Sequence, residues 1–119
     1  MRPFHMTQAS AAIDTTTKAK DRIIVALDVA DAAAARSIVA KLKDSVGAFK
    51  IGLQLFTAEG PSFVHELTGS GAKIFLDLKF HDIPNTVAMA AVEAARLGVW
   101  MFNVHASGGS ETMRQTVVE

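Results

Sequence analysis

Residues 75–86 read Phe75-Leu-Asp-Leu-Lys-Phe-His-Asp-Ile-Pro-Asn-Thr86. The change along this stretch from an apolar strand pattern to the start of a helix indicates the fold class. Its first half belongs to an apolar run over residues 73–79, which predicts a buried β-strand. Pro84 suits the first turn of a helix, where no backbone N–H is needed. The alanine-rich stretch behind it predicts a helix closed by Gly98. A strand followed by a helix, with charged residues at the junction, is a β-α unit.

The same unit recurs before and after this stretch. We predict strands over residues 22–28, 48–52 and 99–105, each short and apolar. Asp31 can cap the first helix, Pro61 suits the first turn of the second and Ser110 can cap the fourth. The second helix is expected to end at Gly69 or Gly71 and the fourth to continue to residue 119. The apolar positions of the first helix share one face: Ala35, Ile38, Val39, Leu42 and Val46.

Four β-α units with nearly continuous apolar strands predict an α/β protein with a parallel sheet. An open doubly wound sheet and a (β/α)₈ TIM barrel both fit, but no G-x-G-x-x-G motif follows the first strand. Polar residues end all four strands, on the face where barrel enzymes build their sites: Asp28, Lys50, Asp77 with Lys79, and Asn103 with His105. A whole barrel needs about 250 residues. We therefore expect residues 21–119 to form about four of its eight units, a half-barrel.

Composition narrows the functional classes. The chain has 119 residues, enough for one domain, and 12 basic residues balance 12 acidic ones. A neutral chain without a basic run gives no support for binding nucleic acid or an anionic membrane. Cysteine is absent, which fits the cytoplasm, and no apolar run approaches the roughly 18 residues of a membrane span. Residues 1–20 lack periodicity and a signal-peptide core, so we expect a disordered N-terminal extension.

The densest group of reactive side chains is Asp77, Lys79 and Asp82. Positions i and i+2 of a strand share a face, so Asp77 and Lys79 should point the same way, inward in a barrel. Asp82 follows in the loop. Because opposite charges favour the ammonium form, a lysine between two carboxylates suits a proton donor better than a Schiff-base nucleophile. The alternative without catalysis is a salt-bridge network that closes the barrel end.

Other strand-end residues could join this group. Asp28 and Lys50 end neighbouring strands, although either could equally be a solvated strand end. His81 and His105, together with an aspartate, raise the question of a metal site. Lys79 would repel a cation and isolated histidines are more often solvent-facing, so we predict no metal site.

Four stretches of the chain together resemble the successive motifs of bacterial orotidine 5′-phosphate decarboxylases, in order and with similar spacing over residues 22–119. The twelve-residue block quoted above is the most specific of them. D-x-K-x-x-D alone is weaker, because sugar-phosphate decarboxylases of the same superfamily share part of it. The other stretches are Ala26-Leu-Asp28, Phe49-Lys-Ile-Gly52 and Asn103-Val-His-Ala-Ser-Gly-Gly109.

The resemblance implies decarboxylation of orotidine 5′-monophosphate to uridine 5′-monophosphate, without metal or cofactor. By the same resemblance Lys79 would donate a proton to C6 of the pyrimidine and Asp77 would lie against the substrate carboxylate. Asp28 and Lys50 would contact the ribose hydroxyls.

The resemblance also implies a homodimer whose site is shared between subunits, with Asp82, Ile83 and Thr86 supplied by the partner subunit. The family's phosphate-binding arginine, its mobile lid and its last four strands would lie beyond Glu119. We therefore expect the 119-residue chain by itself to be inactive.

Two alternatives stay open. The first is another phosphosugar enzyme of the superfamily, such as a keto-gulonate-phosphate decarboxylase or a metal-dependent pentose-phosphate epimerase. The second is a half-barrel without catalysis that only associates with itself. The His-Asp-Ile-Pro-Asn-Thr continuation over residues 81–86 favours the decarboxylase of orotidine monophosphate over the first.

Overall fold

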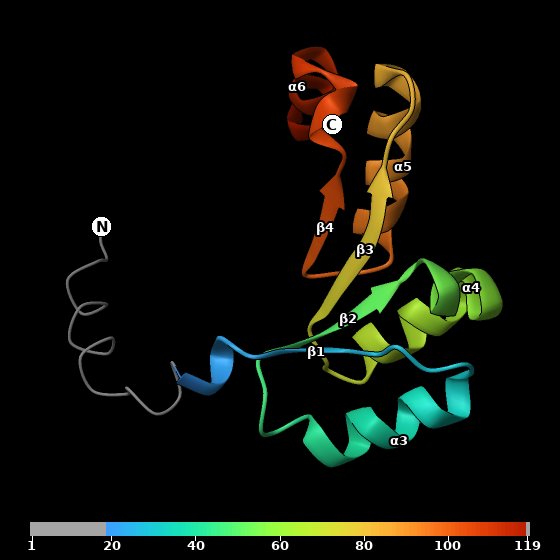
Figure 1. The fold of residues 1–119 in the computed structure, drawn as a ribbon, viewed down its shortest axis with the longest axis vertical. Coiled ribbons are helices and arrows are strands. Elements are labelled where there is room, and N and C mark those ends of the chain that lie inside the picture. Colours follow the sequence, from blue (N-terminus) through green and yellow to red (C-terminus); the bar gives the residue numbers. More distant parts are fainter. Residues whose placement is uncertain (1–18, 119) are drawn as a thin grey trace.

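The structure, a computed structural model, describes residues 19–118. The predicted disordered extension of residues 1–20 lies outside the described residues, except for residues 19 and 20, which are helical. Four β-α units follow in chain order (Figure 1). Their elements are β1 (Ile24–Ala26), α3 (Ala32–Leu42), β2 (Ala48–Gly52), α4 (Leu53–Gly69), β3 (Ile74–Phe80), α5 (Pro84–Arg96), β4 (Met101–Val104), a 3₁₀ turn (Ala106–Gly108) and α6 (Ser110–Val118).

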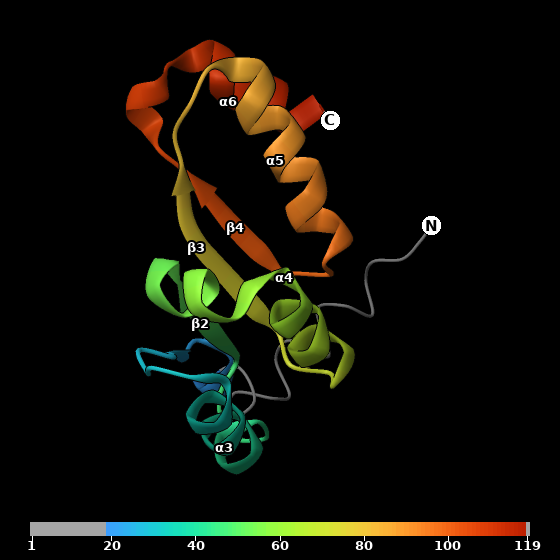
Figure 2. The same ribbon diagram turned by 90° about the vertical axis from the view of Figure 1, so that its right-hand side faces the viewer.

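The four strands form one parallel sheet in the order β1-β2-β3-β4. Because crossovers between parallel strands are right-handed, an order that never reverses puts successive helices on the same face of the sheet. Figures 1 and 2 show α3, α4 and α5 following one side of the twisted sheet. A doubly wound sheet would reverse its strand order and carry helices on both faces. The barrel prediction is therefore confirmed, as four consecutive units of it.

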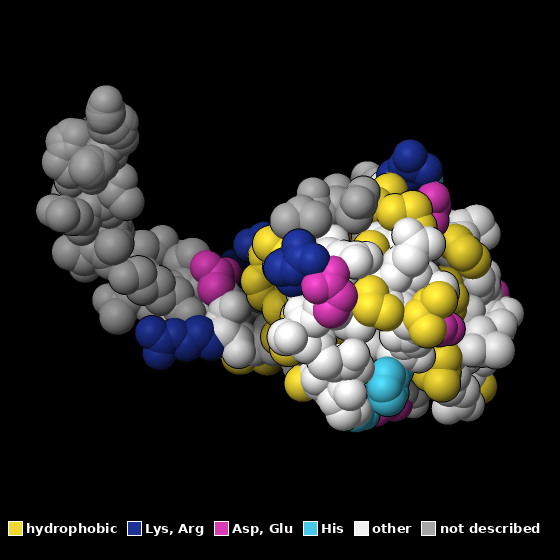
Figure 3. Space-filling model, turned by 90° about the horizontal axis from the view of Figure 1, so that it is seen from above, with side chains coloured by type: hydrophobic (Ala, Val, Ile, Leu, Met, Phe, Trp, Pro, Cys, Tyr) yellow, Lys and Arg dark blue, Asp and Glu magenta, His cyan; other side chains and the backbone are white. Residues whose placement is uncertain are grey.

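The carboxyl ends of the four parallel strands lie along one edge of the twisted sheet. In Figure 1, β1 and β2 run toward the right while β3 and β4 run toward the upper end of the molecule, and Figure 3 looks onto that upper end. Histidine and charged side chains appear on this end beside scattered hydrophobic ones. In a barrel this is the face that holds the active site.

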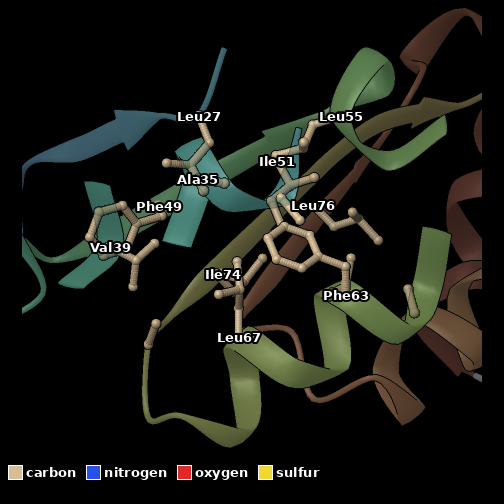
Figure 4. Close-up of a cluster of buried hydrophobic side chains, with 14 residues drawn as sticks. Leu27, Ala35, Val39, Phe49, Ile51, Leu55, Phe63, Leu67, Ile74 and Leu76 are labelled. Carbon is tan, nitrogen blue, oxygen red and sulfur yellow. The ribbon is translucent and has the colours of Figure 1, made fainter. Parts of the chain in front are cut away.

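The core lies between the outer face of the sheet and helices α3 and α4 (Figure 4). Phe49, Ile51, Ile74 and Leu76 project from β2 and β3 into this layer and are at most 2% exposed. The predicted apolar face of the first helix is confirmed: Ala35 and Val39 are buried, and Ile38, Leu42 and Val46 pack against the core. Asp31 caps this helix as predicted, since its Oδ1 accepts the Ala34 N–H at 2.9 Å.

The second helix differs from the prediction. It begins at Leu53, directly after β2, and not near Pro61. The backbone breaks at Gly60, whose φ of 78° only glycine adopts readily, and Pro61 then starts a second helical segment. Pro61 was correctly placed at the start of a helical segment, but the first segment was missed. Ser110 is the first residue of α6 and not its cap, a difference of one position.

The inner face of the sheet is open among the described residues. Ile24 on β1 is 41% exposed and Ala26 is also exposed, although the apolar strands were expected to be buried on both faces. The side chains that would face them belong to the opposite wall of a barrel. None of the helices within residues 19–118 is long and apolar enough to cross a bilayer.

Candidate active site

Asp77 is the centre of the charged cluster. It lies near the carboxyl end of β3 and is only 8% exposed. Its Oδ1 accepts from Lys79 Nζ at 2.9 Å, and its Oδ2 lies 3.4 Å from Lys50 Nζ. The register explains the second contact: Lys50 lies opposite Phe75 and Gly52 opposite Asp77, so Lys50 and Asp77 are on one face of adjacent strands. The predicted meeting of Lys50 with this cluster is therefore found in the structure.

The surroundings of Asp77 favour its ionised form. The hydrogen bond from Lys79 lowers the pKa of the Asp77 carboxyl, and the hydrogen bond from Asn103 lowers it further. Burial acts in the opposite direction, and Lys50 adds a smaller lowering. Hydrogen bonds to the charged form outweigh desolvation here, so Asp77 is a carboxylate at neutral pH.

The arrangement of the charged groups in the cluster is the reverse of the one we predicted from the sequence. We predicted a lysine between two carboxylates, whereas Asp77 is a carboxylate between two ammonium groups. Asp82 makes no salt bridge with the described lysines, and its Oδ1 instead accepts the backbone N–H of Ile83 at 2.7 Å. It does line one hollow together with Lys79 and Thr86. The hydrogen-bond partner of the Asp82 carboxylate is thus the neighbouring backbone and not Lys79.

Lys79 reaches Asp77 through an irregular backbone. Leu76 pairs with Phe102 and Phe80 with Val104, so three residues of β3 lie opposite the single residue Asn103. Lys79 has φ of 52° and is the only non-glycine residue among residues 19–118 with positive φ. Strand alternation correctly predicted that the side chains of Asp77 and Lys79 lie together, but it did not predict this bulge, which sets the direction of the Lys79 side chain. Strained backbone of this kind clusters at functional sites.

Asn103 joins the two residues across the bulge. Its Oδ1 accepts the Lys79 backbone N–H at 2.9 Å, and its Nδ2 donates to Asp77 Oδ1 at 2.7 Å. The sequence placed Asn103 at a strand end but assigned it no role. The available signal was its position on the strand next to Asp77, because neighbouring parallel strands end at the same edge.

The remaining predicted site residues lie around this cluster without bonding to it. Asp28 follows β1, is exposed and makes no salt bridge with the described lysines. Ile83 is 65% exposed just before α5, and Thr86 is exposed in its first turn. All three lie at the carboxyl end of the sheet, as barrel geometry predicts.

Two histidines stack at the same end. The rings of His81 and His105 lie 4.5 Å apart, tilted by 17°, and His105 Nδ1 is 2.6 Å from Ser107 Oγ. Within residues 19–118, His, Asp and Glu side chains form no group of three or more that could hold a metal ion. The two rings thus contact each other, and His105 also contacts Ser107.

The chain is similar to known proteins over most of its length. A sequence model of the family described as "Orotidine 5'-phosphate decarboxylase / HUMPS family" matches residues 21–119. The chain is 56% identical over 102 residues to the orotidine 5′-phosphate decarboxylase of Syntrophomonas wolfei and 54% identical over 103 residues to that of Geobacter sulfurreducens. These matches cover 86% and 87% of this chain but 43% of each relative, so the chain spans less than half their length.

Solved structures give the same result for the fold. The crystal structure of orotidine 5′-phosphate decarboxylase from Lactobacillus acidophilus matches with a TM-score of 0.74 at 44% identity, covering 79% of this chain and 42% of that one. An uncharacterized conserved protein from Geobacillus kaustophilus matches with the same TM-score at 39% identity. At 44% and 39% identity, the similarity to these structures includes the sequence as well as the fold.

Proposed function

This chain belongs to the orotidine 5′-phosphate decarboxylase / HUMPS family, and we propose that the protein it represents converts orotidine 5′-monophosphate to uridine 5′-monophosphate in de novo pyrimidine synthesis. One observation carries the proposal: a buried carboxylate, Asp77, held between Lys50 and Lys79 at the carboxyl end of a parallel sheet. The described residues supply one wall of that site, since they correspond to 42–43% of the relatives' length.

The arrangement suits a decarboxylation that leaves a carbanion. When the bond between C6 and the carboxylate breaks, carbon dioxide leaves and the electron pair remains on C6. The Lys79 ammonium stabilises that charge as it develops and then supplies the proton to C6. The Asp77 carboxylate both holds this ammonium, at 2.9 Å, and lies against the substrate carboxylate, which disfavours the bound ground state.

Lys50 and Asp28 are proposed to bind the ribose hydroxyls. Lys50 is already positioned by Asp77, while Asp28 lies at the end of the adjacent strand β1. No metal ion or cofactor is needed for these steps, because the charged side chains provide both the stabilising charge and the proton. We place the enzyme in the cytoplasm, where pyrimidine nucleotides are made.

The proposal includes a homodimer in which Asp82, Ile83 and Thr86 complete the site of the partner subunit. Their exposure supports this. Asp82 has no ionic partner among the described residues, and a 65% exposed isoleucine beside it is a side chain suited to an interface. Met89 on α5 and Met113 on α6 are two further exposed apolar side chains.

The test is an assay of uridine monophosphate formation and carbon dioxide release by the complete gene product, compared with its Lys79→Ala variant. Removing one charged group aimed at the developing carbanion should lower turnover by at least about 10²–10³. Lys73→Ala is the matched control, because Lys73 precedes the same strand at its opposite end and lies over the Trp100 ring. Far-UV circular dichroism checks the fold. Turnover by Lys79→Ala close to wild type would remove Lys79 from the mechanism.

A second candidate is a phosphosugar decarboxylase or epimerase, since the family description covers more than one activity. Assays with 3-keto-gulonate 6-phosphate and with a pentose 5-phosphate, each with and without divalent metal, separate it. Activity on these and not on orotidine monophosphate would replace the proposal. A protein inactive on all three that still self-associates would favour the role without catalysis.

A further inference from the structure

We infer that Asn103 is a positioning residue for the reaction: its side-chain amide holds the bulged backbone at Lys79 and the carboxylate of Asp77 in one fixed geometry, so that the Lys79 ammonium is delivered to the reacting carbon. The inference rests on the proposed function, which makes Lys79 the proton donor. It goes beyond that function because Asn103 itself is not assigned to touch the substrate.

The first argument is the backbone. The bulge leaves three residues of β3 opposite one residue of β4, and a bulge of this kind leaves backbone groups without a ladder partner. The Lys79 N–H is such a group, and Asn103 Oδ1 accepts its hydrogen bond at 2.9 Å. A side-chain carbonyl thus replaces the missing strand carbonyl at the residue whose φ is 52°. Without that acceptor, the left-handed conformation of Lys79 loses one of the bonds that fix it.

The second argument is the carboxylate. Asp77 Oδ1 accepts both from Lys79 Nζ at 2.9 Å and from Asn103 Nδ2 at 2.7 Å. The Asn103 bond therefore fixes the rotation of the carboxylate group, and the carboxylate in turn fixes the ammonium. Asp77 is 8% exposed, so water is a poor substitute for this donor.

The third argument is the choice of side chain. A side chain at residue 103 must accept a hydrogen bond from the Lys79 backbone N–H and donate one to the Asp77 carboxylate. It therefore needs an acceptor and a donor on the same short planar group. Among side chains of this size the amide of asparagine provides both. The same requirement fixes its orientation, because a flipped amide would place Nδ2 against an N–H and Oδ1 against a carboxylate.

Two substitutions separate positioning from simple stabilisation. Asn103→Leu keeps the size and removes both bonds. Asn103→Asp keeps the acceptor for Lys79 but replaces the donor with a second carboxylate facing Asp77. Because like charges at this distance disfavour double ionisation, the introduced carboxyl and Asp77 take up a shared proton more readily than an isolated carboxyl. The protonated group can then donate to Asp77 as the amide did.

Steady-state kinetics of the complete gene product should therefore show three results. Asn103→Leu lowers kcat by about 10²-fold with little change in KM, because a displacement of about 1 Å can cost that much. Asn103→Asp is similarly slow at neutral pH, and its rate relative to wild type rises as the pH is lowered. The rate of Asn103→Leu relative to wild type does not rise as the pH is lowered. Gln115→Leu, which removes another amide bonded to a carboxylate, that of Glu111 on α6, is the control and retains wild-type kinetics.

A second measurement does not depend on activity. The ¹³C signal of the Asp77 carboxyl should titrate at higher pH in Asn103→Leu than in wild type, since one of the bonds that lower its pKa is gone. The Lys79 amide hydrogen should also exchange faster. If wild type fails to decarboxylate orotidine monophosphate, the proposed function fails, and these two signals still decide the role of Asn103. Wild-type kcat in Asn103→Leu, or unchanged titration and exchange, would overturn the inference.

Discussion

Because the backbone at Lys79 is left-handed, we expect glycine at this position to give a more stable fold than alanine, the reverse of the usual order within a strand. A residue with a Cβ atom pays roughly 1–2 kcal/mol to adopt this conformation, whereas glycine adopts it freely. Lys79→Ala keeps the Cβ atom, and hence the strain, and loses the ion pair with Asp77. The Lys79 side chain is 65% exposed, so that pair contributes at most about 1 kcal/mol. We expect Lys79→Ala to destabilise the fold by no more than that.

Lys79→Gly loses the same ion pair but relieves the strain. Against this relief stands the greater freedom of glycine in the unfolded chain, about 0.5–1 kcal/mol. The glycine variant should therefore be more stable than the alanine variant, by about 0.75 kcal/mol at the midpoints of the two opposing ranges. Ala26→Gly provides the control. Ala26 lies on β1 in the same sheet, and there glycine should be less stable than the native alanine by about 0.5–1 kcal/mol.

The assay is urea unfolding followed by circular dichroism, with midpoints compared at equal slope. At residue 79 glycine should exceed alanine, and at residue 26 alanine should exceed glycine. Both Lys79 variants should be inactive, so that relief of strain and loss of function go together. If glycine is worse than alanine at both positions by a similar margin, Lys79 is not left-handed in solution and the account of the bulge is wrong.

Three further predictions follow from the cluster and the open sheet. Asp82→Ala should be inactive. Mixing it with inactive Lys79→Ala under subunit exchange should restore activity, since a mixed dimer can hold one intact site. If activity does not recover, Asp82 belongs to the site of its own chain. Because the pKa of Asp77 is lowered from an ordinary value of 3.8, its stabilising contribution is complete above that value and is lost as the pH falls through the lower, folded value. The stability difference between wild type and Asp77→Asn should thus be constant near neutral pH and shrink below about pH 4, which unfolding midpoints at several pH values would show; a difference that does not change with pH would contradict it. The 119-residue chain purified by itself should self-associate through the edges of β1 and β4, which are unpaired among residues 19–118, and show no useful turnover, as measured by light scattering and a substrate assay. A stable monomer, or full turnover, would contradict this prediction.

The sequence predicted the fold well because its signals are periodic and local. Apolar runs located all four strands, and the i, i+3, i+4 spacing around Ala35 and Val39 located the face of α3 that is buried. The first segment of α4 was missed because Leu53 follows β2 with no intervening loop. Without a turn signal between them, an apolar strand and an apolar helix look alike.

The site was predicted in composition but not in geometry. Asp77, Lys79 and Lys50 were placed together correctly, because consecutive strands of β-α units lie side by side with their carboxyl ends at the same edge. The bulge was not foreseen, since positive φ at a lysine has no signature in sequence. The direction of the Asp82 side chain depends on a bond to the next residue, and no pattern of spacing reports such a bond.

The sheet separates a packed outer face from a charged cluster at the carboxyl ends of its strands, and this division has a consequence for how such a protein can evolve. Side chains such as Asp28 and Lys50 can be exchanged with little effect on the hydrophobic layer behind the strands, so mutation can explore new reactions while the chain still folds. Asp77 is different, because it is buried and bonded to residues of three strands, β2, β3 and β4. A lineage that acquires a new substrate should therefore alter the periphery of this site first and Asp77 last.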